Sequence, residues 1–109
     1  MIRGELFSAV LAREFGKPRP VVVVQSDLAR VSQSIIVCPL TSDLIDAATP
    51  FRVRIARTPE NGLKQNSDVM CDKITAADAS RIGDRIGSLT NEQMQEVAER
   101  LIVILALAD

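Results

Sequence analysis

Four consecutive valines at positions 21–24 constrain the fold of this chain more than any other feature of its sequence. β-Branched side chains favour strands over helices, and a run without a polar residue indicates a strand that is buried on both faces. Pro20 suits the first position of such a strand because it lacks an N–H group, and Pro18 favours an extended conformation for the residue before it. Arg19 therefore lies in a stiffened segment, where its guanidinium can face an anion with little loss of conformational freedom. The alternative is a solvated arginine that precedes a strand.

Short strand patterns separated by turns fill most of the remaining sequence. We expect further strands at residues 4–12, 34–40, 51–56, 68–72 and 81–89, with the valine strand ending near Gln25. Residues 13–18 form a charged hairpin loop, and residues 39–50 include a polar loop.

Local signals refine this outline. Ser26 or Asp27 can cap a helical turn over residues 26–30, and an Asn-Gly pair indicates a turn at residues 59–62. In the strand at residues 51–56 apolar and basic residues alternate, which places Arg52 and Arg54 on a solvent-facing side. Phe51 belongs to that pattern and is expected in the core, as is Phe7 in the first strand.

A helix is expected at the C-terminal end of the sequence. Thr90 and Gln93 fit a capping box, and apolar residues follow at helical spacing: Met94, Val97, Ala98, Leu101, Ile102 and Leu105. Residues 101–108 are apolar on nearly every side, which indicates either a subunit interface or deep burial within one chain. The sequence therefore predicts a mainly β (α+β) fold: one domain over residues 1–109, built as a small, mostly antiparallel barrel with a C-terminal helix.

Composition supports a small cytoplasmic protein. Hydrophobic residues make up 47% of the 109, enough for one core, and no run of eighteen apolar residues or signal-peptide pattern is present. We therefore expect a cytoplasmic location and no membrane partner. Cys38 and Cys71 each lie within an apolar run and are expected to be buried, reduced thiols.

The residue types present exclude several kinds of chemistry. The chain contains no histidine, which removes Ser-His-Asp and Cys-His arrangements and, with only two separated cysteines, disfavours a zinc site. Neither nucleotide-binding glycine motif occurs. Chemistry must therefore rest on arginine, lysine, carboxylates and hydroxyls, and we expect no metal or other cofactor. Residues 1–57 hold eight Lys/Arg against five Asp/Glu, whereas residues 58–109 hold five against nine, which is compatible with one side that faces a polyanion.

A family resemblance follows from short segments whose order and spacing extend over nearly the whole chain. These segments are Arg3-Gly4-Glu5, Arg19-Pro20 with the valines and Gln25-Ser26-Asp27, Pro39-Leu40-Thr41-Ser42, Cys71-Asp72-Lys73-Ile74, Arg81-Ile82-Gly83 and Ile86-Gly87-Ser88-Leu89. In these segments the sequence resembles the MazF/PemK-type toxins, which are bacterial mRNA interferases of toxin–antitoxin modules.

The resemblance implies an SH3-like barrel that forms a homodimer and cuts single-stranded RNA without a metal, leaving a 2′,3′-cyclic phosphate and a 5′-hydroxyl. It implies that Arg19 and Thr41 are the main catalytic pair, and that Asp72 matches a carboxylate used by some members. The residue chemistry is compatible: Arg19 offers a planar fork to phosphate oxygens, Thr41 a hydroxyl donor, and Asp72 a candidate base. The structural alternatives are that Thr41 caps a turn and that Asp72 forms an ion pair with Lys73 or an arginine.

We expect RNA contacts from further residues in the same segments and in the first loop, namely Lys17, Arg13, Phe15, Gln25 and Ser42. Phe15 is expected either to stack on a base or to pack over the barrel. The basic loops are also expected to attract an acidic antitoxin segment that is partly disordered before it binds.

Two departures from the family pattern bear on activity. The first loop is short, and Met70 replaces an arginine that often precedes the aspartate by two positions. Two other functions therefore stay open: a gyrase-poisoning toxin of the same fold, which the absence of tryptophan disfavours, and an inactive barrel that only binds an antitoxin.

Overall fold

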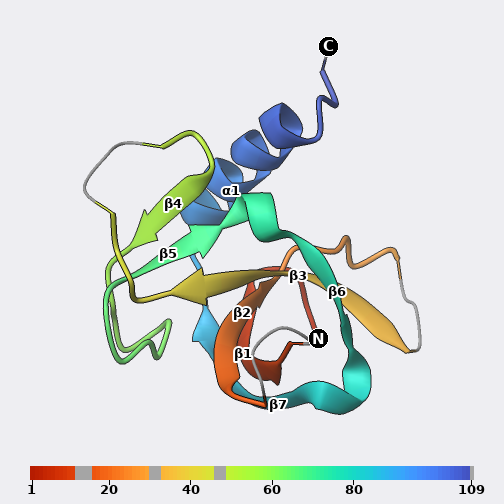
Figure 1. The fold of residues 1–109 in the computed structure, drawn as a ribbon, viewed down its shortest axis with the longest axis vertical. Helices are drawn as coiled ribbons and strands as arrows, with labels where there is room; N and C mark the ends of the chain where they lie inside the picture. Colours follow the sequence, from red (N-terminus) through yellow and green to blue (C-terminus); the bar gives the residue numbers. More distant parts are fainter. Residues whose placement is uncertain (12–15, 30–32, 46–48, 109) are drawn as a thin grey trace.

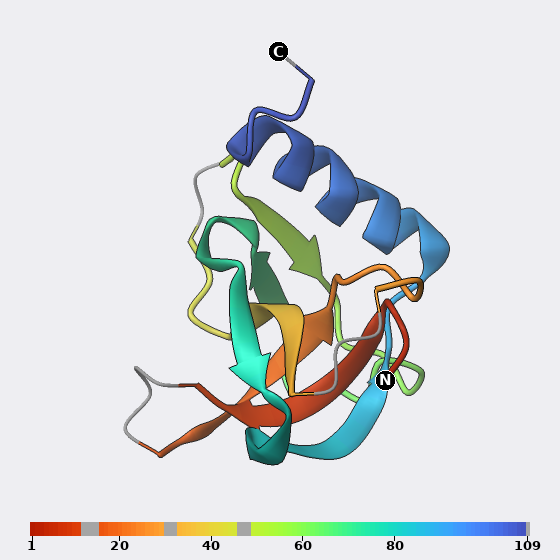
Figure 2. The ribbon, with the colours of Figure 1, turned by 90° about the vertical axis from the view of Figure 1, so that its right-hand side faces the viewer.

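The structure is a computed structural model that describes residues 1–11, 16–29, 33–45 and 49–108 (Figures 1 and 2). In these ranges the chain forms one coiled antiparallel sheet, two short 3-10 helices and one α-helix. The elements are β1 (Glu5–Val10), β2 (Pro18–Val23), β3 (Ser34–Thr41), β4 (Arg52–Ile55), β5 (Ser67–Met70), η1 (Cys71–Lys73), β6 (Thr75–Asp78), η2 (Ala79–Arg81), β7 (Ile82–Ser88) and α1 (Asn91–Ile104).

β3 is the strand to which both halves of the sheet are joined. One edge of β3 pairs with β2, and the other edge pairs with β6 near its start and with β5 near its end. The strand order is β4-β5-β3-β2-β1-β7, with β6 beside β3 (Figure 1). In the described ranges the two end strands of this order, β4 and β7, do not pair with each other. Closure of the sheet into an SH3-like barrel therefore stays a prediction.

The segment from β5 to β6 differs from the sequence-based expectation. A strand was expected over residues 68–72, but β5 ends at Met70 and the chain turns through η1 before β6 begins. β6 was missed because Ala76 and Ala77 have low strand propensity. Their strand conformation comes from pairing with Ile35 and Ile36 of β3, which only the tertiary structure supplies.

The valine run is buried on both faces, as its composition predicts. Val22 and Val24 belong to one core cluster, whereas Val21 and Val23 belong to a second cluster on the other side of β2. Because successive side chains of a strand point to opposite faces, this one strand joins the two clusters.

α1 begins with the predicted capping box. Thr90 Oγ1 accepts from the Gln93 N–H (3.1 Å), and Gln93 Oε1 accepts from the Thr90 N–H (2.9 Å). The buried side of α1 consists of Met94, Val97 and Leu101, and the helix packs over β4 and η1 (Figure 2). The apolar tail is not buried within this chain, since large side chains stay exposed on it: Ile102, Val103, Leu105 and Leu107.

Other local expectations had mixed outcomes. The Ser26 segment forms a hydrogen-bonded turn, in which Ser26 Oγ accepts from the Leu28 N–H (3.1 Å). The expectation that Phe51 lies in the core was wrong, because 43% of it is exposed at the turn before β4, whereas Phe7 packs against the second cluster. In the part of the chain that the structure describes, no helix has the length and apolar character needed to cross a membrane.

Candidate RNA-binding groove and catalytic site

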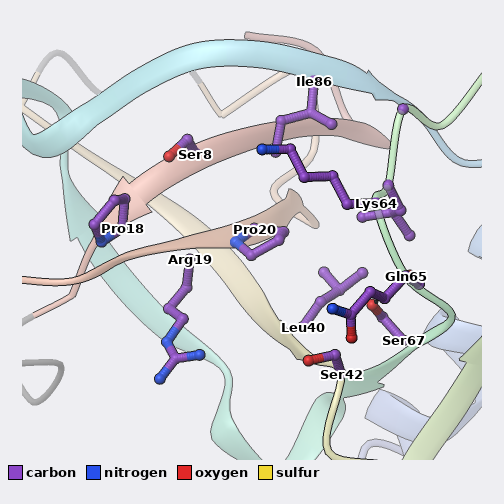
Figure 3. A pocket seen from close by; sticks show the side chains of 12 residues that line it. Ser8, Pro18, Arg19, Pro20, Leu40, Ser42, Lys64, Gln65, Ser67 and Ile86 are labelled. Carbon is purple, nitrogen blue, oxygen red and sulfur yellow. Dashed lines mark hydrogen bonds between the residues drawn. The ribbon is translucent and has the colours of Figure 1, made fainter.

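A groove of about 410 Å³ lies beside the prolines that flank Arg19. Its walls come from the β1–β2 hairpin, the end of β3, the connection between β4 and β5, and β7. Figure 3 shows Ser8 and Pro18 at one end of the groove and the polar side chains of Ser42, Gln65 and Ser67 at the other. The apolar part of the lining includes Pro20, Leu40, Leu63 and Ile86, so the groove combines apolar surface with a few hydrogen-bonding groups.

The β4–β5 connection is held against β7 by the predicted Asn-Gly turn. Asn61 is buried, and its Oδ1 accepts from the N–H groups of Thr58 (3.0 Å) and Leu63 (3.0 Å). Gly62 has φ +66°, and a Cβ there would lie 2.2 Å from the carbonyl oxygen of Ile86, so only glycine fits this close backbone approach. The turn therefore fixes the wall of the groove that contains Lys64 and Gln65.

Arg19 is a half-buried residue of β2 that lies opposite Ala9 of β1. In the pairing of β2 with β3, Val21 lies opposite Pro39. The β2–β3 pairing ends there, with Arg19 two residues before Val21 and Thr41 two residues after Pro39. Because side chains alternate along a strand, Arg19 shares a face with Val21, and Thr41 shares a face with Pro39. Figure 3 shows the guanidinium of Arg19 extending away from Pro20 and from the Ile86 wall.

Thr41 is the last residue of β3 and is half-buried. Its Oγ1 accepts from the N–H of Asp43 (3.1 Å), which is the turn-capping contact considered as the structural alternative for this residue. A hydroxyl that accepts in this way keeps its own hydrogen for donation. Turn capping and donation to a phosphate oxygen are therefore compatible.

Asp72 lies in η1, where its side chain is exposed. η1 connects β5 to β6, and both of these strands pair with the same edge of β3. Asp68 pairs with Thr41 and Val69 pairs with Leu40, so the chain after Asp68 runs away from Thr41, and Asp72 lies four residues further along it.

The candidate RNA-contact residues fall into three groups. Ser42 lines the groove, and Lys17 is exposed immediately before β2. Gln25 lies apart from the groove: its Oε1 accepts from the Ile36 N–H (3.2 Å) and its amide donates to the Ala29 carbonyl, so it ties β2 to the following turn. Arg13 and Phe15 lie outside the described residues.

The two cysteines are free and buried, as expected. A hydrogen bond with Cys71 and burial raise the pKa of the Cys38 thiol well above its ordinary range, so this thiol stays neutral. Among residues 1–11, 16–29, 33–45 and 49–108, no group of three or more Cys, Asp or Glu side chains is arranged to hold a metal ion.

Comparison with known proteins decides the family. Residues 2–105 match the family described as "PemK-like, MazF-like toxin of type II toxin-antitoxin system". The chain belongs to this family. It is 36% identical over 109 residues to "Probable endoribonuclease MazF" of Mycolicibacterium smegmatis, an alignment that covers 99% of each chain. It is 34% identical over 112 residues to "Endoribonuclease EndoA" of Bacillus subtilis, covering 98% of this chain and 96% of the relative.

A solved structure supports the same fold. The chain superposes on "Endoribonuclease in complex with its cognate antitoxin from Mycobacterial species" with a TM-score of 0.81 and 19% identity, covering 100% of this chain and 98% of the other. The antiparallel sheet with one C-terminal helix is thus the MazF fold.

Sequence reasoning missed one charged cluster of this MazF-like chain. Asp68, of which 2% is exposed, pairs with Thr41 across β3 and β5 and binds two arginines of β4. Its Oδ1 accepts from Arg54 Nε (2.6 Å) and its Oδ2 from Arg52 Nη1 (3.3 Å). The alternating sequence of β4 predicts that both arginines lie on one face of the strand. Their shared partner becomes evident only from the pairing of β4 with β5, in which Arg54 lies opposite Asp68.

Proposed function

We propose that this toxin is a metal-independent, sequence-specific endoribonuclease that cleaves single-stranded mRNA in the cytoplasm and thereby inhibits translation and growth. The observation that carries the proposal is the match, over nearly all of the chain, to two relatives named endoribonucleases. The placement of Arg19 and Thr41 in the neighbouring strands β2 and β3 supports it, because each lies two residues beyond the last pair at the same end of the β2–β3 ladder. We also propose that the coiled sheet is an SH3-like barrel.

The proposed reaction is an internal transfer at one phosphate of the RNA. The 2′-oxygen attacks the phosphorus while its proton passes to a base, and the bond from phosphorus to the 5′-oxygen breaks. The leaving 5′-oxygen takes up a proton. The products are a 2′,3′-cyclic phosphate and a 5′-hydroxyl, and the sum needs no water and no oxidant.

Arg19 is assigned to the negative charge that develops on the phosphoryl oxygens. Its planar fork can donate two hydrogen bonds to a phosphate. Thr41 donates its free hydroxyl hydrogen to the same oxygens. Asp72 is the candidate base, because it is an exposed carboxylate in η1, directly after the strand β5 that pairs with Thr41 through Asp68.

The RNA is proposed to cross the groove from Lys17 towards Ser42, with Lys64 as an added cation on the groove wall. Arg13 and Phe15 are further proposed contacts, and Gln25 is one only for RNA that extends beyond this groove, since it lies apart from it. Lys17, Arg19 and Lys64 place three cations in or beside one groove, where they can bind the phosphates of RNA. The apolar lining can contact the faces of unstacked bases.

Two protein partners are proposed. The exposed apolar side chains at the end of α1 support a homodimer, because large apolar patches on one chain are typical of interfaces. A mass by light scattering near that of one 11.9 kDa chain at micromolar concentration contradicts the dimer. The second partner is an acidic antitoxin segment that folds on binding and occludes the groove. Unchanged RNA cleavage on titration with the cognate antitoxin contradicts this occlusion.

The activity is tested by incubating the purified protein with a long single-stranded RNA in excess EDTA and then identifying the ends. We expect cuts at one short sequence, 5′-hydroxyl ends that a polynucleotide kinase can label, and cyclic phosphates at the other ends. Intact RNA contradicts the proposal. So do 5′-phosphate ends, which require a water nucleophile instead of the 2′-hydroxyl.

A further inference from the structure

We propose that Asp68 is a positioning residue that holds the Thr41 hydroxyl in its donating orientation through Arg52 and the backbone of Asp43. The inference rests on the proposed function, because it assigns Asp68 a part in the same cleavage reaction. The carboxylate itself lies between two arginines and touches no substrate.

The first link is the buried carboxylate. Asp68 is 2% exposed, and both of its oxygens are used: Oδ1 accepts from Arg54 Nε at 2.6 Å and Oδ2 accepts from Arg52 Nη1 at 3.3 Å. One buried anion thus fixes two long cationic side chains that would otherwise sample many rotamers.

The second link runs from the arginines to the loop that follows β3. Arg52 Nη1 also donates to the carbonyl oxygen of Asp43 (3.1 Å), and Arg54 Nη2 donates to the carbonyl oxygen of Ile45 (2.9 Å). The loop after Thr41 is therefore held at two carbonyls by side chains whose positions depend on Asp68.

The third link reaches the hydroxyl. The N–H of Asp43 donates to Thr41 Oγ1 (3.1 Å), so Asp43 is held on its carbonyl side by Arg52 and on its N–H side by Thr41. Occupation of one acceptor position on Oγ1 leaves the hydroxyl hydrogen directed elsewhere. If Asp43 moves, that direction is lost, although Thr41 stays in β3 by its pairing with Asp68.

The network is tested by a double-mutant cycle with Asp68→Asn and Thr41→Val. Asp68→Asn keeps the side-chain volume but removes the charge that holds both arginines. We expect kcat to fall about 10- to 100-fold, since misplacement of a reacting group by about 1 Å costs up to ~10² in rate. KM should change little. In a Thr41→Val background the same change should have almost no further effect on kcat, because the hydroxyl it positions is absent.

Two more variants keep the test decisive. Arg52→Gln removes both contacts of the Arg52 guanidinium, to Asp68 and to the Asp43 carbonyl, but leaves the Asp68–Arg54 pair. It should therefore reproduce part of the kcat loss even if Asp68→Asn fails to fold. Glu5→Gln is the matched control, because it breaks another carboxylate–arginine pair of 2.6 Å, Glu5 with Arg85, that lies away from the groove lining. It should leave kcat unchanged.

A measurement that does not need cleavage separates this inference from the proposed function. Amide hydrogen exchange at Asp43 should be faster in Asp68→Asn and Arg52→Gln than in the unchanged protein, and unaltered in Glu5→Gln. Independent, multiplicative kcat losses from Asp68→Asn and Thr41→Val overturn the inference, as does unchanged Asp43 exchange. Absence of cleavage by the unchanged protein overturns the proposed function instead, and the exchange result then still decides whether the network exists.

Discussion

Asn61→Ala should destabilise the protein by removing the side chain that holds together the loop forming the groove wall. The Asn61 side chain is 2% exposed and makes three hydrogen bonds to backbone groups. Its Oδ1 accepts from the N–H groups of Thr58 (3.0 Å) and Leu63 (3.0 Å), and its Nδ2 donates to the carbonyl oxygen of Ala56 (2.9 Å). Alanine leaves all three backbone groups without their partner.

The size of the effect follows from these contacts. A hydrogen bond contributes a net ~1 kcal/mol, so the free energy of unfolding should fall by about 3 kcal/mol. For a chain of this length 1 kcal/mol corresponds to about 4 °C in the melting temperature, which gives a decrease of about 12 °C. Urea unfolding and thermal melts at equal protein concentration measure both quantities, and equal concentration matters if the chain is a dimer.

Asn66→Ala is the control, since Asn66 is exposed in the same loop and its Oδ1 accepts a single bond from the Arg57 N–H (2.9 Å). It should cost no more than about 1 kcal/mol. Equal losses for Asn61→Ala and Asn66→Ala would refute the argument that the buried amide organises the loop.

Three further substitutions test separate parts of the structure. Thr90→Ala removes the accepting oxygen at the start of α1 and should lower the urea-derived free energy of unfolding by about 1 kcal/mol, whereas an unchanged midpoint contradicts the capping role. Hydrogen bonding from Arg85 lowers the pKa of Glu5 below its ordinary 4.5, so this pair stabilises the protein above pH 4.5 and its contribution is lost as pH falls. Glu5→Gln should therefore be less stable than the unchanged protein at neutral pH but not in acid, and a difference that is constant with pH refutes this. Lys64→Ala should weaken RNA binding and reduce the salt dependence of the binding constant by about 0.7 in the log–log slope, and an unchanged slope removes Lys64 from the RNA path.

Much of the fold followed from local signals that act within a few residues. The valine run, the turn at Asn61 and the capping box of Thr90 were confirmed because each is determined by backbone chemistry at its own position. β6 could not be predicted, since Ala76 and Ala77 become a strand only through pairing with β3. The environment of Phe51 likewise depends on neighbours that are distant in sequence.

The residues of the candidate site likewise include some that the sequence predicted and some that only the structure revealed. Family resemblance named Arg19 and Thr41, which lie two residues beyond the last pair at the same end of the β2–β3 ladder, but their catalytic roles stay predictions. The sequence did not reveal Asp68, because the role of a carboxylate near the start of a short strand depends on the two arginines that β4 brings beside it. Lys64 was missed for a related reason: its place on the groove wall results from the packing of the Gly62 turn against β7.

The most direct test of the account compares RNA cleavage by the unchanged protein and by Arg19→Ala in single-turnover reactions with EDTA. Loss of one positioned electrostatic donor should reduce the cleavage rate by about 10²–10³, with the same melting temperature and the same cleavage sequence. Arg81→Ala, which removes an exposed arginine outside the groove lining, serves as the control and should cleave at the unchanged rate. An Arg19→Ala protein that cuts RNA as fast as the unchanged protein would contradict the central claim.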